Sequence, residues 1–261
     1  MQPYFAIAIL GAESTGKSSL AQQLQVCFLN AGFNAVLQTE LLRSWCEKNQ
    51  QLPLQHQQNL ILDLQIKSQN KWLQSIQNQT TLTAPFIYIS DTAALQTAAY
   101  SHYYFEDFSL DEKAQAAHQF FNFTLLMGLD LPWQEDSLRT GVESQKPVDN
   151  CLRQLLQESK IELPFSTIYG QGQQRLGNAW LALQKQTALR GKLPDLHQLE
   201  LPMQSKSISS LTAPLTDFNS KVATRNLYHL ENGMKRWGHY CDNCADGECE
   251  KKLFQNLKNP S

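Results

Sequence analysis

Residues 11–18, GAESTGKS, fulfil the pattern GxxxxGK[ST] at every position. Glycines at the two ends of such a stretch let backbone N–H groups turn inward and bind phosphate oxygens. Lys17 adds a positive charge for these oxygens, and Ser18 offers a hydroxyl group to Mg²⁺, which prefers oxygen ligands. The stretch is therefore predicted to be a P-loop that binds ATP. Its expected nucleotide contacts are Gly11, Ala12, Glu13, Ser14, Thr15, Gly16, Lys17, Ser18 and Ser19.

The residues on both sides of this stretch have the periodicity that a P-loop requires. Residues 4–10 form a short apolar run that predicts a buried strand, and residues 19–28 carry apolar side chains at helical spacing. Strand, glycine-rich turn and helix thus follow in the right order. The start of the helix adds a partial positive charge to the phosphate site.

A second hydrophobic strand is predicted over residues 86–91, and it ends in a carboxylate, Asp91. This is the Walker B pattern. We expect Asp91 to hold Mg²⁺ together with Ser18. The next residue is Thr92, at a position where enzymes that activate water often carry glutamate, so hydrolysis is not favoured.

The acceptor side is predicted from a short strand over residues 35–38, which is followed by Glu40 and Arg43. Ligands bind outside the carboxyl ends of the strands in open parallel sheets, so these two side chains could face an acceptor substrate. An exposed acid and base on the first turn of a helix is the alternative. Downstream, residues 50–79 contain apolar side chains at helical spacing, which predicts one or two amphipathic helices with the many glutamines on the solvated face.

Two arginines are further candidates for the nucleotide site. A strand over residues 123–127 leads into residues 131–141, which we interpret as a lid whose Arg139 neutralises charge on the migrating phosphoryl group. A fifth strand over residues 165–169 ends at a glycine-containing turn, and Arg175 in the next helix could lie over the adenine. Five strands alternating with helices predict an α/β fold, a three-layer sandwich around a five-stranded parallel sheet.

Composition excludes other classes of protein. The chain has 261 residues, with 22 Lys and Arg against 24 Asp and Glu and a net charge of −2, which argues against a dedicated nucleic-acid binder. The N-terminal apolar run is too short for a membrane span and no cationic region precedes it, so a cytoplasmic protein without a membrane or nucleic-acid partner is expected. The expected partner is a small-molecule substrate.

Taken together, these motifs resemble the ribosylnicotinamide kinase domain of NadR-type proteins. The matching pieces are GAESTGKSSL at residues 11–20, ExxR at Glu40 and Arg43, IYISDT at residues 87–92 and PWQEDSLRTG at residues 132–141. The similarity covers residues 4–185. It implies a nucleoside-kinase-like P-loop fold that moves the γ-phosphoryl group of ATP to the 5′-hydroxyl of nicotinamide riboside, giving nicotinamide mononucleotide.

The resemblance also implies roles for particular residues. Glu40 and Arg43 would lie in the substrate pocket, and Trp133 takes the place of a lid tryptophan that stacks on the nicotinamide ring. Glu13 would contact a ribose hydroxyl or order the lid. The family often reads DTD where this chain has Ala93 as the third residue, so Glu40 would have to substitute for the missing acid, or the substrate differs. The alternatives are a kinase of another nucleoside or small alcohol, and a non-catalytic ATP-dependent switch protein with a metal- or redox-sensing tail.

The C-terminal part changes in composition. Residues 1–190 are predicted to form the kinase-like domain and residues 191–221, rich in proline and serine, a linker. Residues 222–261 form a small Cys-rich extension with a possible site for zinc or an iron–sulfur cluster. A redox-sensitive thiol pair or unligated cysteines would fit the same spacing. The candidate ligands are Cys241, Cys244, Cys249 and His239.

Overall fold

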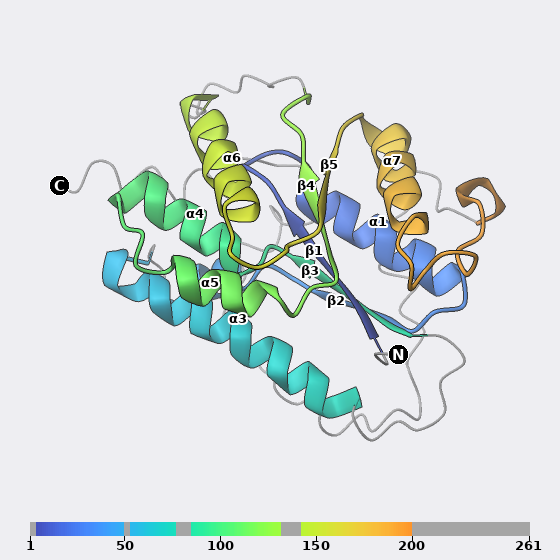
Figure 1. Cartoon of the computed structure of the whole chain (residues 1–261), viewed down its shortest axis with the longest axis horizontal. Helices are drawn as coiled ribbons and strands as arrows, with labels where there is room; N and C mark the ends of the chain where they lie inside the picture. Colours follow the sequence, from blue (N-terminus) through green and yellow to red (C-terminus); the bar gives the residue numbers. More distant parts are fainter. Residues whose placement is uncertain (1–3, 50–52, 77–84, 132–141, 200–261) are drawn as a thin grey trace, which may run out of the picture. The chain divides into compact units, whose positions relative to one another are not determined.

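A parallel five-stranded sheet forms the centre of the domain in a computed structural model, which describes residues 4–49, 53–76, 85–131 and 142–199 (Figure 1). The strand order is β2-β3-β1-β4-β5. The predicted α/β fold and all five predicted strands are confirmed. The strands are β1 (Tyr4–Leu10), β2 (Ala35–Gln38), β3 (Phe86–Asp91), β4 (Phe123–Met127) and β5 (Phe165–Ile168).

The register of the strands aligns their carboxyl ends at one edge of the sheet. Ile9 of β1 pairs with Asp91 of β3, and Leu10 pairs with Leu126 of β4. β1 is the central strand, and its residues from Phe5 to Leu10 are all buried. Burial on both faces explains why this strand reads as a continuous apolar run instead of an alternating one.

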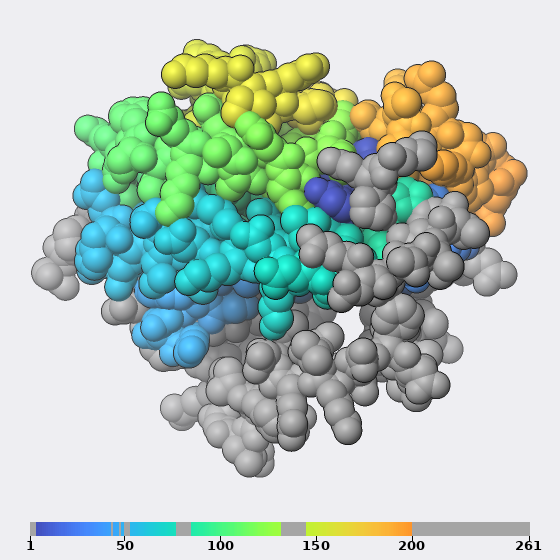
Figure 2. Space-filling view, turned by 60° about the horizontal axis from the view of Figure 1, so that its bottom comes forward, coloured from blue at the N-terminus to red at the C-terminus, as the bar shows by residue number. Residues whose placement is uncertain are grey.

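Helices cover both faces of the sheet (Figure 1). On one face lie α1 (Lys17–Asn30) and α7 (Gly172–Gln184). On the other lie α3 (Gln55–Ile76), α4 (Ala94–Phe105), α5 (Asp111–His118) and α6 (Val142–Gln157), while α2 (Leu41–Asn49) packs against α3. Figure 2 shows the outer surface of α3 with the green atoms of the α4–α5 region beside it, where Lys113 Nζ lies 2.8 Å from Asp63 Oδ1.

α4 is the most deeply buried of the described helices. Every residue from Ala94 to His102 is buried, because α3, α5 and α6 all pack around this helix. Alanines at three positions of this segment keep its surface small enough for close helix packing. α4 is therefore enclosed by other helices on several sides.

The prediction that the glutamines of residues 50–79 form a solvated face is wrong for three of them. The region forms one described helix, α3, and Gln58, Gln65 and Gln69 are buried on it. Gln58 Nε2 donates a hydrogen bond to Pro53 O, which ties the helix to the residues just before it. Gln65 and Gln69 line a hollow at the carboxyl ends of β2 and β3, together with polar residues of these strands.

The packed domain continues past residue 190, where the predicted linker begins. Leu193 is buried, and Trp180 Nε1 of α7 donates a hydrogen bond to Pro194 O at 2.9 Å. A short 3₁₀ helix at Leu196–Gln198 follows. The rest of the predicted linker and the whole cysteine extension lie outside the described residues. Within the described part of the chain, no helix combines the length and apolarity needed to cross a membrane.

The free energy of unfolding is expected to decrease as the pH is lowered, because of His118 at the end of α5. This side chain is fully buried, and desolvation lowers its pKa from 6.5 to about 3. Its Nε2 lies 2.8 Å from Thr124 Oγ1 of β4. Between about pH 6.5 and pH 3, His118 is therefore protonated in the unfolded chain but neutral in the folded protein. The stabilisation of the folded state is complete above pH 6.5 and is lost as the pH falls through this range.

Urea unfolding of the wild type at pH 7 and pH 5 should show a loss attributable to His118 of about 2 kcal/mol. The variant His118→Gln keeps a polar group for Thr124 but cannot titrate, so its loss over the same pH interval should be smaller by that amount. Equal losses in the two proteins would show that His118 is not the titrating group.

Candidate active site

The P-loop curls between β1 and α1 in the predicted position. α1 begins at Lys17, directly after Gly16, whose φ of 80° lies in the left-handed region that glycine adopts most readily. A Cβ at Gly11 would lie 2.7 Å from the Cβ of Met127, so only glycine fits there. Both glycines of the motif are thus required by the backbone, and the N-terminus of α1 points into the loop as an anion site needs.

Two side chains of the P-loop bond to the loop itself. Lys17 Nζ and Thr15 Oγ1 donate hydrogen bonds to Ala12 O, at 3.0 and 2.8 Å. The ammonium group is buried and is held at the inner side of the loop. A phosphate chain bound by the loop would offer oxygens to the same group, so Lys17 is placed where the motif predicts.

Asp91 ends β3 beside the P-loop. Its pairing with Ile9 places it two residues before Gly11 on the neighbouring strand, and the residue is 6% exposed. The turn that follows is strained, because the β-branched Thr92 has a φ of 71°. Ser90 Oγ donates a hydrogen bond to Thr92 O at 2.6 Å, and Thr92 N donates to Ile9 O at 3.1 Å. These bonds fix the direction of the chain as it leaves Asp91.

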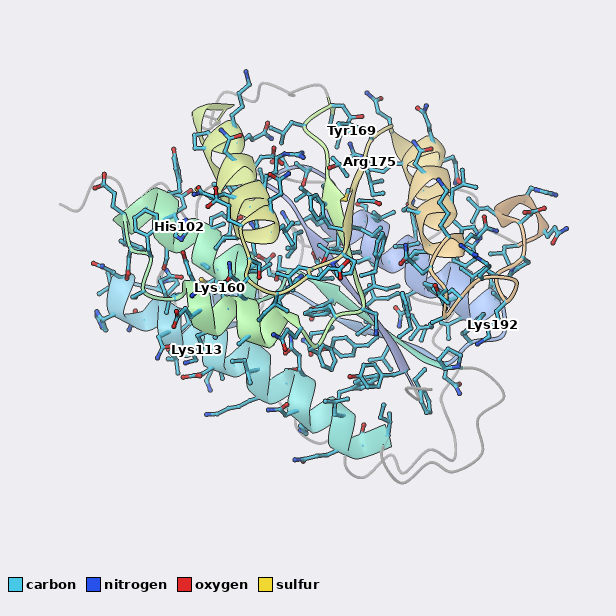
Figure 3. The ribbon with its side chains drawn as sticks, in the orientation of Figure 1. His102, Lys113, Lys160, Tyr169, Arg175 and Lys192 are labelled. Carbon is cyan, nitrogen blue, oxygen red and sulfur yellow. The ribbon has the colours of Figure 1, made fainter. Side chains whose placement is uncertain are left out.

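Arg175 holds the P-loop to the ends of β4 and β5. Its Nε donates to Gly170 O at 2.6 Å, its Nη1 donates to Thr15 O, and its Nη2 lies 2.5 Å from Asp130 Oδ1. The residue is 4% exposed and lies near Tyr169 (Figure 3). These contacts position the loop. That Arg175 could also lie over the adenine stays a prediction.

Glu13 and Gly11 are tied to α4 and α6 by contacts that the sequence did not predict. Tyr104 OH donates to Glu13 Oε1 at 3.1 Å, and Gln145 Nε2 of α6 donates to Glu13 O at 2.8 Å. Gln96 Oε1 of α4 accepts a hydrogen bond from Gly11 N at 3.1 Å. Together with Arg175 of α7, these contacts hold the loop from both faces of the sheet, and Glu13 contacts the helix that follows residues 132–141.

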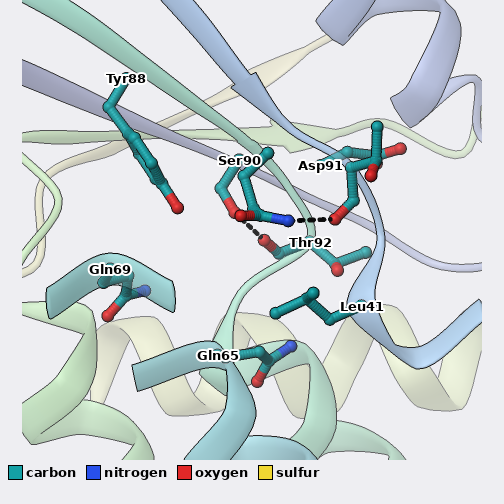
Figure 4. Close-up of a pocket in the computed structure, with 9 residues that line it drawn as sticks. Leu41, Gln65, Gln69, Tyr88, Ser90, Asp91 and Thr92 are labelled. Carbon is teal, nitrogen blue, oxygen red and sulfur yellow. Dashed lines mark hydrogen bonds between the residues drawn. The ribbon is translucent and has the colours of Figure 1, made fainter. Parts of the chain in front are cut away.

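A hollow lies beyond the carboxyl ends of β2 and β3, where the acceptor site was expected (Figure 4). Glu40 is buried between two residues that line it, Thr39 and Leu41, and Arg43 belongs to α2. The side chain of Arg43, Trp133, Arg139 and the cysteine extension lie outside the described residues. The lining consists of Gln38, Thr39, Leu41, Gln65, Gln69, Tyr88, Ser90, Asp91 and Thr92.

Only a hard-cation site with few protein ligands fits the described side chains. In the described ranges, no three His, Cys, Asp or Glu side chains gather into a metal-binding group. Ser18 and Asp91 offer a hydroxyl and a carboxylate oxygen at the P-loop. Magnesium is commonly bound through one or two such groups together with nucleotide phosphates, so these residues fit it.

Sheet order, P-loop and Walker B carboxylate define a P-loop protein of the parallel α/β class. A family model described as "AAA domain" matches residues 6–175, and the chain belongs to this family. No curated protein matches the chain significantly.

Two solved structures of the NadR protein share the fold, and a third solved structure, of another protein, is similar at a lower TM-score. NadR protein in complex with NR is 17% identical with a TM-score of 0.53, and the match covers 78% of this chain and 52% of that one. NadR protein in complex with NAD and AMP-PNP is 20% identical with a TM-score of 0.53, covering 72% and 50%. A deoxyadenosine kinase from M. mycoides with bound dATP is 11% identical with a TM-score of 0.46, covering 70% and 100%. The chain spans about half the length of the NadR protein.

Proposed function

We propose that this protein is an ATP-dependent small-molecule kinase with nicotinamide riboside as its preferred acceptor. One observation carries the proposal: Asp91 lines the hollow and also lies on the strand beside the P-loop, through its pairing with Ile9. A phosphate chain in the loop and an acceptor in the hollow would meet at this carboxylate. This is the arrangement that direct transfer between two bound substrates requires.

The donor side binds and orients the triphosphate. The loop amides and the N-terminus of α1 bind phosphate oxygens, and Lys17 exchanges its bond to Ala12 O for a bond to the group that is transferred. Ser18 and Asp91 would hold Mg²⁺, which supplies positive charge to the phosphate oxygens when bound. Arg139 remains the predicted second positive charge and Trp133 the predicted stacking residue.

The acceptor side orients a hydroxyl group toward the donor. Glu40 is assigned the role of accepting the proton of this hydroxyl, because it is buried next to the hollow at the end of β2. Ala93, at the position of the second acid of the DTD pattern, is the N-cap of α4 and has no group for this task. The preference for nicotinamide riboside is supported by the NadR-type motifs of the sequence and by the fold shared with the NadR protein.

Incubation with labelled ATP, Mg²⁺ and a panel of ribosides tests the proposal. We expect label in nicotinamide mononucleotide, with the highest kcat/KM for nicotinamide riboside, and strongly reduced transfer by Asp91→Asn, which keeps the size of the side chain but removes the charge. Faster transfer to another nucleoside would make the protein a kinase of that acceptor. ATP binding without any labelled product would instead favour the switch.

A further inference from the structure

Two amide side chains that line the acceptor hollow have polar atoms without a hydrogen bond to another described residue. Gln65 and Gln69 lie four residues apart on α3, so they share one face of the helix, and both line the hollow (Figure 4). They are 6% and 5% exposed. Gln65 Oε1 accepts a hydrogen bond from Thr97 Oγ1 of α4 at 3.2 Å, which fixes the plane of its amide.

Within the described residues, Gln65 Nε2 and both polar atoms of Gln69 have no protein hydrogen-bond partner. None of these atoms is among the fully buried side-chain atoms without a partner, so they are open to the hollow, where water or a ligand can pair with them. Two such amides side by side, facing a hollow at the carboxyl ends of parallel strands, form an incomplete hydrogen-bonding site. A ligand in the hollow would complete it.

We propose that Gln65 and Gln69 determine acceptor specificity by pairing with a planar, uncharged group that both donates and accepts hydrogen bonds. The ring carboxamide of nicotinamide riboside is such a group. This inference rests on the proposed function, because it assigns the hollow to the acceptor. It goes further in naming the two residues that read the ring and the chemical class that they select.

The charge of the acceptor group decides which acceptors the site prefers. A carboxamide can accept from one glutamine NH₂ group and donate to the other glutamine oxygen, so all of its polar atoms are used. A carboxylate in the same place can only accept, and it must leave water for a hollow that Asp91 also lines. Carboxamide acceptors are therefore preferred over the corresponding carboxylates.

Nicotinamide riboside and nicotinic acid riboside make a matched pair of probes, since they differ only in this group. The wild type should favour the amide in kcat/KM by about 100-fold, as expected for a site that hydrogen-bonds its substrate. Gln69→Met and Gln65→Met keep the length of the side chain without its polar atoms. Each should raise KM for nicotinamide riboside about 10- to 100-fold and bring the preference for the amide below about tenfold, with little change in kcat.

Gln74→Met is the control, because Gln74 is an exposed glutamine on the same helix, and it should behave as the wild type. Affinity for ATP should be equal in all four proteins, which excludes a general folding defect. An unchanged preference in Gln69→Met and Gln65→Met overturns the inference, and so does a wild type that binds neither riboside.

Calorimetric binding of the two ribosides separates this inference from the proposed function. If nicotinamide riboside binds the wild type and binds the methionine variants more weakly, but no phosphoryl group is transferred, the site assignment holds and the kinase proposal fails. If transfer proceeds and the methionine variants keep the wild-type preference, the kinase proposal holds and the assignment of Gln65 and Gln69 fails.

Discussion

Replacing Lys17 with methionine is expected to lower kcat for phosphoryl transfer by about a thousandfold. The ammonium group of Lys17 is buried in the P-loop, 3.0 Å from Ala12 O, where it would face the charge that develops on the transferred group. Methionine keeps most of the aliphatic length, so the loop remains filled while the charge is lost. Single-turnover measurements with saturating Mg·ATP separate this effect on the chemical step from any change in nucleotide affinity.

Lys48→Met is the matched control for this experiment, because Lys48 is an exposed lysine in the last turn of α2. It should keep the wild-type kcat. The thermal unfolding temperatures of both variants should stay close to the wild-type value. A Lys17→Met protein that retains more than a tenth of the wild-type kcat would remove the P-loop lysine from the mechanism.

Arg175→Met is expected to destabilise the protein by about 2–3 kcal/mol, because the buried guanidinium loses its hydrogen bonds to two backbone carbonyls and its ion pair with Asp130, which is 31% exposed. Three segments lose their common partner in this variant: the P-loop at Thr15 O, the turn at Gly170 O, and Asp130 after β4. The P-loop should also become less well positioned, so KM for ATP should rise. Urea unfolding measures the first effect and steady-state kinetics the second.

Two comparisons make this prediction specific. Arg190→Met removes an exposed arginine after α7, and its stability should stay within about 0.5 kcal/mol of the wild type. The ratio of ATP to GTP utilisation should not change in Arg175→Met, since Arg175 acts through the loop. A stable variant with an altered ratio of ATP to GTP utilisation would instead show that Arg175 contacts the adenine, as the sequence suggested.

The sequence predicted the parts of the site whose chemistry depends on neighbours along the chain. The P-loop needs its glycines, lysine and serine at fixed spacing, and the Walker B carboxylate needs a strand directly before it. Both motifs can therefore be recognised in short segments of the sequence. Apolar periodicity was sufficient for the five strands and for the parallel sheet. Helix α5 was not predicted, because it is short and contains no large apolar side chain that would give a periodic signal.

Contacts between residues far apart in the sequence were missed. Tyr104 contacts Glu13, which lies 91 positions away in the sequence, and Arg175 contacts Thr15, 160 positions away. No local pattern encodes such pairs. The glutamines of α3 were misassigned because hydropathy treats a polar residue as solvent-facing, whereas a binding hollow also buries polar groups.

One helix reaches both halves of the proposed site. From α4, Gln96 accepts from the backbone of the P-loop, Tyr104 donates to Glu13, and Thr97 orients the amide of Gln65 in the acceptor hollow. Its side chains from Ala94 to His102 are all buried, so a substitution in this part of α4 would disturb donor alignment and acceptor recognition together. Redesign for a new substrate should therefore begin on α3, where changes in specificity can be made without retuning the catalytic loop.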